Sequence, residues 1–390
     1  MSERTANCLA KLDRMNKTLR HEEADRVPVS DFFWGGFLER WRKEKGLPAD
    51  ADIYTYYDLD WIVTMPNMDP HIKEFEILKE NDEEVVVRTG FEATIRKKFV
   101  DPMPAFVEFA TNTIEKMDAF QFDDPWDDRR YFSAGDNQIA GVGDGFTRNI
   151  PPWIDGVKAL RPNFPVYGSV CEGHETLWRI IGSENVLMWI GLYPDELGRF
   201  IERVGEFVIG LTKAQIKAAD GLLDGMVIWG DVAYVRDMMF SPRFWRKYFK
   251  PIVNEMIQVC HDNDLPVIYH GCGNVKRILP DFIEMGLDSY NPLEAKAGLD
   301  VVELRQQYGH DMGFCGNMNA LDWALESKEA LKDIVLRKLN AAKGGGYIFQ
   351  SDHSVPSNVS AEKYEYVVNL VREYGKYPLQ LGEYDIPEIL

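Results

Sequence analysis

The stretch PVIYHGCGNVKRILPDFIEMGLDSYNPLE, residues 266–294, carries one strand, one helix and a second strand in succession. The first run, residues 266–273, is short, apolar and rich in β-formers, as are parallel strands buried on both faces. The helical pattern that follows ends on Gly286, a residue typical of helix C-termini. Because a strand, a helix and a strand in close succession form a parallel unit, this stretch predicts an α/β fold.

The same alternation continues on both sides of this stretch. From residue 225 onward it gives four complete strand–helix units. The eight predicted strands span residues 26–33, 60–67, 164–173, 225–233, 266–273, 288–294, 312–317 and 345–352. Eight strands with interleaved helices in 390 residues predict a single (β/α)8 TIM barrel. An open, doubly wound sheet is the alternative, but Gly35 and Gly36 match a nucleotide-binding glycine turn only weakly.

Residues 68–163 do not follow this alternation. Within them, EEVVVRTGFEATIRKKF (83–99) has the pattern of a β-hairpin that turns at Thr89–Gly90. We therefore expect one domain over residues 1–390, in which 68–163 is an insertion after the second strand that covers the barrel mouth.

The composition excludes several functional classes. A formal net charge of −19 disfavours nucleic-acid binding and anionic membrane surfaces. The N-terminal residues contain no apolar signal-peptide core, and no apolar run is long enough to span a membrane. The five cysteines are odd in number and widely scattered, which argues against a disulfide framework. We expect a cytoplasmic protein with reduced thiols.

The predicted strand ends carry an unusual set of chemically active side chains. Active sites of such barrels lie at the C-terminal ends of the strands. In chain order these ends supply Asp31, Glu172, His174, Asp231, His270, Cys272, Glu294, Cys315, Asp352 and His353.

A zinc site is one interpretation of this set. Strand alternation places His270 and Cys272 on the same face, and imidazole, thiolate and carboxylate are the ligands that zinc prefers. Either Cys315 or His353 would supply the third ligand. Each residue alone also has a structural explanation, because buried cysteines often act as small core residues and aspartates often cap helices.

Four segments carry a resemblance to a known family: ADRVPV (24–29), WGDVAYVRDMMFSPRFWRKYFKP (229–251), HGCGNVKRILPDFIEMGLDSYNPLEAKAGLDV (270–301) and SDHSVPSNVS (351–360). Over nearly its whole length the chain resembles the uroporphyrinogen decarboxylase-like superfamily. That superfamily includes decarboxylases of haem synthesis and zinc-dependent methyltransferases that work with corrinoid proteins, among them methylcobamide:coenzyme M methyltransferases. The resemblance implies a single (β/α)8 barrel.

The two branches of the superfamily differ at motifs that this chain contains or lacks. The decarboxylases bind substrate carboxylates with an arginine-rich segment after the first strand, whereas here no arginine lies between Arg26 and Arg40. Their substrate-binding aspartate would fall near Asp58 or Asp60, and His353 matches a histidine in their last-strand motif.

The methyltransferase branch binds zinc through a His-x-Cys motif, which His270 and Cys272 match. Its further cysteine follows the last strand, where this chain has Asp352 and His353 instead, so Cys315 is the expected substitute.

The resemblance and the motifs together predict zinc-dependent methyl transfer between a corrinoid protein, carrying cobalamin or a relative, and a small methylated substrate or thiol. Demethylation of a methyl ether is one form of this reaction. The expected metal ligands are His270, Cys272 and Cys315. The expected catalytic residues are Asp231, Glu172, His174 and His353, and the expected substrate contacts are Asp31, Trp34, Tyr234, Glu294 and Asn317. The alternatives are a metal-free uroporphyrinogen decarboxylase and a non-catalytic corrinoid- or tetrapyrrole-binding protein, and the oligomeric state stays open.

Overall fold

A computed structural model describes residues 3–73, 75–101, 103–135, 150–387 and 389 of the chain. The helices are α1 Ala6–Leu19, α2 Gly35–Lys45, α3 Ile53–Tyr56, α4 Ile114–Ala119, α5 Arg129–Phe132, α6 Trp153–Leu160, α7 Gly173–Ile181, α8 Ser183–Leu192, α9 Pro194–Ala219, α10 Pro242–Tyr248, α11 Lys250–His261, α12 Leu279–Glu284, α13 Val301–Tyr308, α14 Ala320–Leu325, α15 Lys328–Leu339 and α16 Ala361–Tyr374, with short 3-10 helices at Ala295–Ala297, Asn340–Ala342 and Gly382–Tyr384. The strands are β1 Ile62–Val63, β2 Glu76–Glu80, β3 Glu84–Arg88, β4 Ala93–Lys98, β5 Ala105–Phe109, β6 Val166–Cys171, β7 Gly225–Trp229, β8 Val267–His270, β9 Ser289–Asn291, β10 Gly313–Met318 and β11 Tyr347–Ser351.

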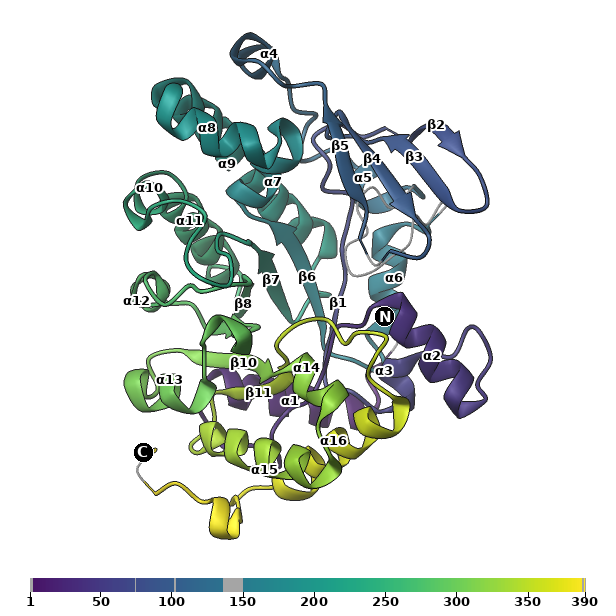
Figure 1. The fold of residues 1–390 in the computed structure, drawn as a ribbon, viewed down its shortest axis with the longest axis vertical. Helices are drawn as coiled ribbons and strands as arrows, with labels where there is room; N and C mark the ends of the chain where they lie inside the picture. Colours follow the sequence, from purple (N-terminus) through teal and green to yellow (C-terminus); the bar gives the residue numbers. More distant parts are fainter. Residues whose placement is uncertain (1–2, 74, 102, 136–149, 388, 390) are drawn as a thin grey trace.

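Seven strands form one parallel sheet in the order β1-β6-β7-β8-β9-β10-β11 (Figure 1). The sheet curls into a half-barrel of the TIM type, and helices follow its strands on the outside, so the predicted α/β class is confirmed. The last six strands all fall within predicted strand segments or differ from them by one residue at an end. Because these strands are parallel and neighbouring in sequence order, their C-terminal ends lie along one edge of the sheet.

The first predicted strand, residues 26–33, forms only isolated bridges in the described part of the chain. Val29 bridges to Phe349 and Phe33 bridges to Val355, both in parallel fashion. On its other side, the amide of Asp60 donates to the carbonyl of Val29 at 2.9 Å. Pro28 has no amide proton to donate, which explains why a continuous ladder does not form there. The segment therefore lies between β11 and the residues that lead into β1.

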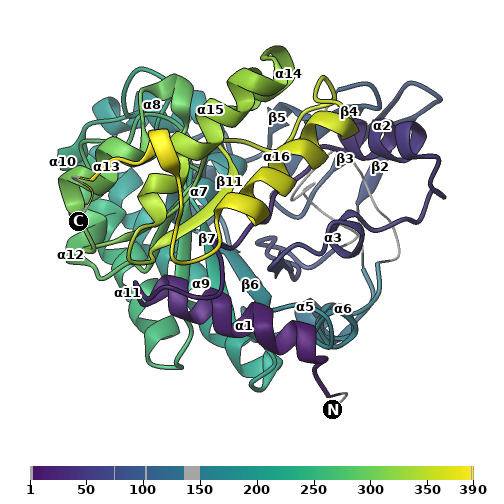
Figure 2. The same cartoon turned by 90° about the horizontal axis from the view of Figure 1, so that it is seen from below.

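Helix α1 packs against the end of the sheet where the strands begin, as the view from below shows (Figure 2). Its Met15 and Leu19 join a buried cluster with inward-facing side chains of five strands, which are Tyr167, Val227, Ile268, Cys315 and Ile348. This cluster fills the interior of the curved sheet, and a larger cluster fills the space between the sheet and the outer helices. The interior is thus packed at the strand starts, which leaves the C-terminal strand ends as the place for a site.

The predicted hairpin is confirmed as strands β3 and β4, which pair antiparallel with Val87 opposite Ile95. Strands β2 and β5 flank them and complete a separate four-stranded sheet between β1 and β6 in the chain. At the turn, the amide of Gly90 donates to the carboxylate of the buried Asp69 at 3.1 Å. Sequence alternation revealed β3, whose residues alternate between partly exposed and buried, whereas all five residues of β2 are exposed.

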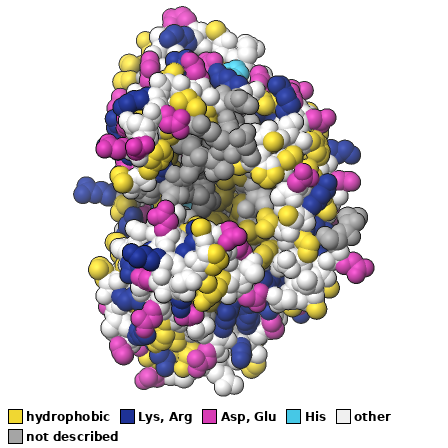
Figure 3. Space-filling model, turned by 90° about the vertical axis from the view of Figure 1, so that its right-hand side faces the viewer, with side chains coloured by type: hydrophobic (Ala, Val, Ile, Leu, Met, Phe, Trp, Pro, Cys, Tyr) yellow, Lys and Arg dark blue, Asp and Glu magenta, His cyan; other side chains and the backbone are white. Residues whose placement is uncertain are grey.

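None of the helices in the described ranges is long and apolar enough to cross a lipid bilayer. The five cysteines are all free thiols, as their scatter in the sequence predicted. One face of the molecule is hollowed, with hydrophobic side chains along part of the hollow and mixed acidic and basic side chains around it (Figure 3).

Candidate metal centre

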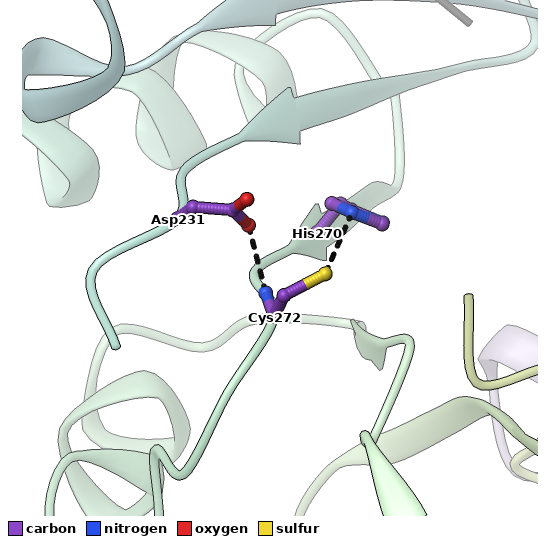
Figure 4. Close-up of side chains that lie close together, drawn as sticks. All are labelled: Asp231, His270 and Cys272. Atoms are coloured by element: carbon purple, nitrogen blue, oxygen red, sulfur yellow. Dashed lines mark hydrogen bonds between the residues drawn. The ribbon is translucent and has the colours of Figure 1, made fainter. Parts of the chain in front are cut away.

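Three potential metal ligands meet at the ends of two neighbouring strands (Figure 4). His270 is the last residue of β8, Cys272 lies two residues beyond it, and Asp231 follows β7, which pairs with β8. Their ligand atoms all lie within 4.8 Å of one another, and Cys272 Sγ is 3.6 Å from His270 Nε2. The strand end therefore directs imidazole, thiol and carboxylate to one point.

Two carboxylates hold the loop that carries Cys272. The amide of Cys272 donates to Asp231 Oδ1 at 2.8 Å, and the amide of Gly273 donates to Glu294 Oε2 at 2.7 Å. Gly273 has φ +85°, and a Cβ atom there would lie 2.6 Å from the carbonyl of Ala233. Only glycine fits this close approach, which explains the residue that follows Cys272.

The orientation of His270 is fixed by Asn291, at the end of β9. The Nδ2 of Asn291 donates to the carbonyl of Cys315 at 3.1 Å, and a carbonyl can only accept. The Oδ1 of Asn291 must therefore face His270, and it accepts a hydrogen bond from His270 Nδ1. This bond leaves Nε2 as the unprotonated nitrogen, directed toward Cys272. It is the tautomer that a histidine needs to bind a metal.

Burial controls the charge of all three groups. It lowers the pKa of His270 and keeps the imidazole neutral. Burial, then the charges of Asp231 and Glu294, raise the pKa of the Cys272 thiol well above its usual value. Burial and the charge of Glu175 also raise the pKa of Asp231. A divalent cation reverses this balance because it stabilises thiolate and carboxylate directly. The donor set of neutral imidazole, thiol and carboxylate therefore fits a zinc ion.

Cys315, the sequence-based choice for the third ligand, does not lie in this group. It is the third of six residues in β10, not its end, and is fully buried in the interior cluster. Its thiol donates to Gln350 Oε1 at 3.1 Å, and Asn291 lies between it and His270. Among the described residues, Asp231 occupies the place that the sequence analysis gave to Cys315.

His174 contacts the backbone of Asp231 rather than its carboxylate. Its Nδ1 lies 2.8 Å from the carbonyl oxygen of Asp231, and its ring packs on Phe240 and Phe249. It thus positions the Asp231 loop and does not face the three ligand atoms.

Glu172 caps α7 by accepting a hydrogen bond from the amide of Glu175 at 2.9 Å. Its other oxygen, Oε2, is buried and has no partner among the described residues. Burial raises the pKa of Glu172 to about 8, so the side chain is protonated at neutral pH.

His353 and Trp34 lie together, with ring centroids 5.7 Å apart and planes 27° from parallel. Both are half-buried, and His353 lies close enough to Asp231 and His270 to interact with them electrostatically. Tyr234, in the loop after β7, is 54% exposed. All three predicted residues keep part of their surface exposed to solvent.

The other predicted substrate contacts have structural partners. Glu294 holds Gly273 and pairs with Lys296, whereas the buried Asn317 bonds to Leu293, Leu299, Val301 and Lys338. Asp31 accepts from the amide and hydroxyl of Ser351 and from the Tyr364 hydroxyl. Their roles as substrate contacts stay predictions, and the contacts observed give each of them a place in the fold.

Asp31 gives a prediction for stability. Burial raises its pKa to about 7, so between pH 4 and pH 7 the unfolded chain releases a proton that the folded chain retains. The free energy of unfolding should therefore fall across this window, by up to about 4 kcal/mol from this group. In Asp31→Asn the amide oxygen still accepts from Ser351, and the loss should disappear. Urea unfolding of both proteins at several pH values measures the difference. An equal fall in the free energy of unfolding with pH in the wild type and in Asp31→Asn would contradict this role of Asp31.

The sequence analysis missed a buried ion pair beside the centre. Glu175 pairs with Arg179 at 2.6 Å across one turn of α7, and Arg179 also donates to Cys171 Sγ at 3.1 Å. Glu175 and Arg179 stand at i and i+4, which is the spacing of a helical ion pair. The pattern was visible in the sequence, but its burial was not, because most such pairs are exposed.

The aspartate expected near position 58 or 60 in a decarboxylase is already engaged. Asp60 is fully buried, forms ion pairs with Arg14 and Arg26, and accepts from the amide of Val29. Arg26 is therefore committed to the fold, and no arginine follows it before Arg40. The two arginines beside Asp60, Arg14 and Arg26, are thus engaged by its carboxylate rather than free to bind several substrate carboxylates.

Comparison with known proteins places the chain among relatives of both branches. Residues 144–374 match the family described as Uroporphyrinogen decarboxylase (URO-D). A uroporphyrinogen decarboxylase from Aquifex aeolicus is 28% identical over 195 residues, which cover 49% of this chain and 53% of that protein. A methylated-thiol–coenzyme M methyltransferase from Methanosarcina mazei is 23% identical over 183 residues, which cover 45% and 46%. The chain thus spans about half the length of the curated relatives it matches.

Among solved structures, a methyltransferase from Methanosarcina mazei superposes with a TM-score of 0.61 over 93% of this chain and 98% of that one, at 17% identity. At this identity the likeness concerns the fold. Because the family match covers more than half of the sequence, the chain belongs to the uroporphyrinogen decarboxylase (URO-D) family.

Proposed function

We propose that this protein is a zinc-dependent methyltransferase that moves a methyl group between a corrinoid protein and a small methylated substrate or thiol. The observation that carries the proposal is the convergence of Asp231, His270 and Cys272 at the strand ends, with the His270 tautomer set by Asn291. A family member that decarboxylates without a metal has no need of such a donor set. The similarity to a methylated-thiol–coenzyme M methyltransferase supports the same choice.

Asp231, His270 and Cys272 would hold the zinc. When bound, zinc supplies a Lewis acid that polarises an ether oxygen or lowers the pKa of a thiol. The protein contributes the fixed lone pair of His270 Nε2 and the rigid loop that carries Cys272. Asp231 has two tasks, because Oδ1 accepts from the Cys272 amide and the carboxylate also faces the other two ligands.

Residues around the centre would handle substrate and protons. Glu172, protonated at neutral pH, holds a proton on a buried carboxyl with one unpartnered oxygen. His353, Trp34 and Tyr234 offer aromatic surfaces for a small substrate at the mouth. The segment 26–33 would serve as the eighth strand of the barrel, and residues 68–163 would cover its mouth as an insertion.

A uroporphyrinogen decarboxylase is the second candidate, favoured by the relatives of that name. Such an enzyme must bind several substrate carboxylates. Here Arg26 is paired with Asp60, and the chain carries a net charge of −19. Each missing charged hydrogen bond forfeits about 1.5–3 kcal/mol, so several together weaken binding by orders of magnitude.

The two enzymes are separated by a pair of anaerobic assays. We expect a thiol and methylcobalamin, or a methoxyaromatic and reduced cobalamin, to change the cobalt spectrum in the presence of the zinc-loaded protein. We expect no coproporphyrinogen from uroporphyrinogen. Efficient decarboxylation would contradict the proposal, and binding of corrinoid without any turnover would favour a non-catalytic carrier.

A further inference from the structure

We propose that a cationic rim beside the metal centre, made of Arg236, Lys276, Arg277 and Lys296, is the docking surface for an acidic partner protein. The inference rests on the proposed function, because the partner would be the protein that delivers or receives the methyl group. The rim residues come from three consecutive loops, which follow β7, β8 and β9.

Hydrogen bonds join these three loops into one surface. The amide of Asn274 donates to the carbonyl of Tyr234 at 2.7 Å, and its side chain donates to the carbonyl of Arg236 at 3.2 Å. The amide of Gly273 donates to Glu294 Oε2 of the third loop at 2.7 Å, and Gly298 of the same loop lies beside Lys276. The four cations therefore lie on three neighbouring loops that contact one another at the strand ends.

The rim borders the metal centre directly. Lys296 pairs with Glu294 at 2.9 Å, and the other oxygen of Glu294 holds the amide next to Cys272. The ammonium of Lys296 and the thiol of Cys272 are close enough to affect each other electrostatically. A protein bound at the rim would thus reach the point where a methyl group is exchanged.

The charge of the rim is opposite to that of the whole chain. All four cations are exposed, whereas the chain as a whole has 63 acidic and 44 basic residues. Arg277 pairs with Asp237 at 3.2 Å. Among the described residues, Arg236 and Lys276 have no acidic partner within ion-pair distance. A local excess of positive charge on an acidic protein is the pattern that steers an acidic partner to one site.

Exposed apolar side chains lie in the same loop. Tyr234 is 54% exposed and Val235 is 45% exposed, immediately before Arg236. Tyrosine and arginine are enriched at the centres of protein–protein interfaces. Cations with an adjacent tyrosine suit a protein surface better than a small anion, which needs only the charges. A second copy of this chain is itself acidic, so its binding at the rim is distinguished from that of another acidic protein by the oligomeric state in solution.

Poly-L-glutamate is a suitable probe of the rim because it carries carboxylates and nothing else that this site could recognise. We expect fluorescently labelled poly-L-glutamate to bind the full chain at low ionic strength and to dissociate at high ionic strength, as salt screens exposed charges. In R236E/K276E the affinity should fall at least about tenfold. The matched control R199E/R337E, which reverses two exposed arginines on α9 and α15, should bind like the wild type.

The zinc content and melting temperature of both variants serve to show that they fold. Equal binding of the probe by R236E/K276E and the wild type would overturn the inference. Displacement of the probe by inorganic phosphate, added at the same concentration of negative charge as the probe carries, would overturn it too. A wild-type dimer in analytical ultracentrifugation that dissociates in R236E/K276E would assign the rim to a second copy instead. Loss of probe binding only in R236E/K276E, in a monomer, supports the acidic partner. Failure of the proposed function would appear separately, as absence of zinc and methyl transfer with rim binding intact.

Discussion

Replacing Cys272 with serine is expected to weaken zinc binding by more than about 100-fold and to abolish methyl transfer. Loss of residues that only support a metal ligand typically costs 10- to 100-fold in affinity, and loss of a thiolate ligand should cost more. Cys272 also lies on a loop whose amides are fixed by Asp231 and Glu294, so a hydroxyl in its place cannot move to compensate. Titration with a competing chelator measures the affinity, and the cobalt spectrum measures the transfer.

Cys315→Ser is the matched control for this prediction. Both cysteines are free thiols near His270, but Cys315 lies in the interior cluster and donates to Gln350. We expect zinc affinity within a few-fold of the wild type and a modest loss of stability, because a hydroxyl can make the same hydrogen bond. Equal loss of zinc in both variants would restore Cys315 as a ligand and contradict the assignment of Asp231.

Asn291→Ala should lower zinc affinity by about 10- to 100-fold without removing a ligand. The substitution removes the acceptor that holds the proton on His270 Nδ1, so the tautomer with a free Nε2 loses its support. Asn291→Asp is the control, because it keeps an acceptor in place and should retain most of the affinity. If Asn291→Ala binds zinc as the wild type does, the orientation of His270 has another origin.

The sequence predicted the candidate site best where potential metal ligands follow the two-residue period of a strand. Residues at i and i+2 on a strand share a face, so His270 and Cys272 were predicted to point the same way. In the structure Cys272 Sγ lies 3.6 Å from His270 Nε2. Glycine on both sides of Cys272 reflected the close packing of the loop, which the position of Ala233 now explains.

How far a side chain lies from the C-terminal end of its strand was harder to predict from the sequence. The predicted strand 312–317 agrees with β10 (Gly313–Met318) to within one residue, but Cys315, two residues before the predicted end, was counted as a strand-end residue although it lies in the middle of the strand. A side chain only two or three residues before the end of a strand therefore already lies in the packed interior rather than at the mouth. Asp231 was predicted as a catalytic residue, and its place beside His270 depends on the pairing of β7 with β8, which one sequence does not reveal.

Burial of charged groups also lay beyond sequence reasoning. The pair Glu175–Arg179 has the spacing of a surface ion pair and is in fact buried beside Asp231. The same holds for Asp60, whose partners Arg14 and Arg26 come from distant parts of the chain. Such contacts depend on which faces of helices and loops the fold brings together.

The most direct test of the central claim is X-ray absorption at the zinc edge of protein purified without chelator, together with its metal content. We expect one zinc per chain with one sulfur ligand at about 2.3 Å and lighter nitrogen and oxygen ligands at about 2.0–2.2 Å. This pattern corresponds to Cys272, His270 and Asp231. Protein that retains no zinc, or a zinc with two sulfur ligands, would contradict the account.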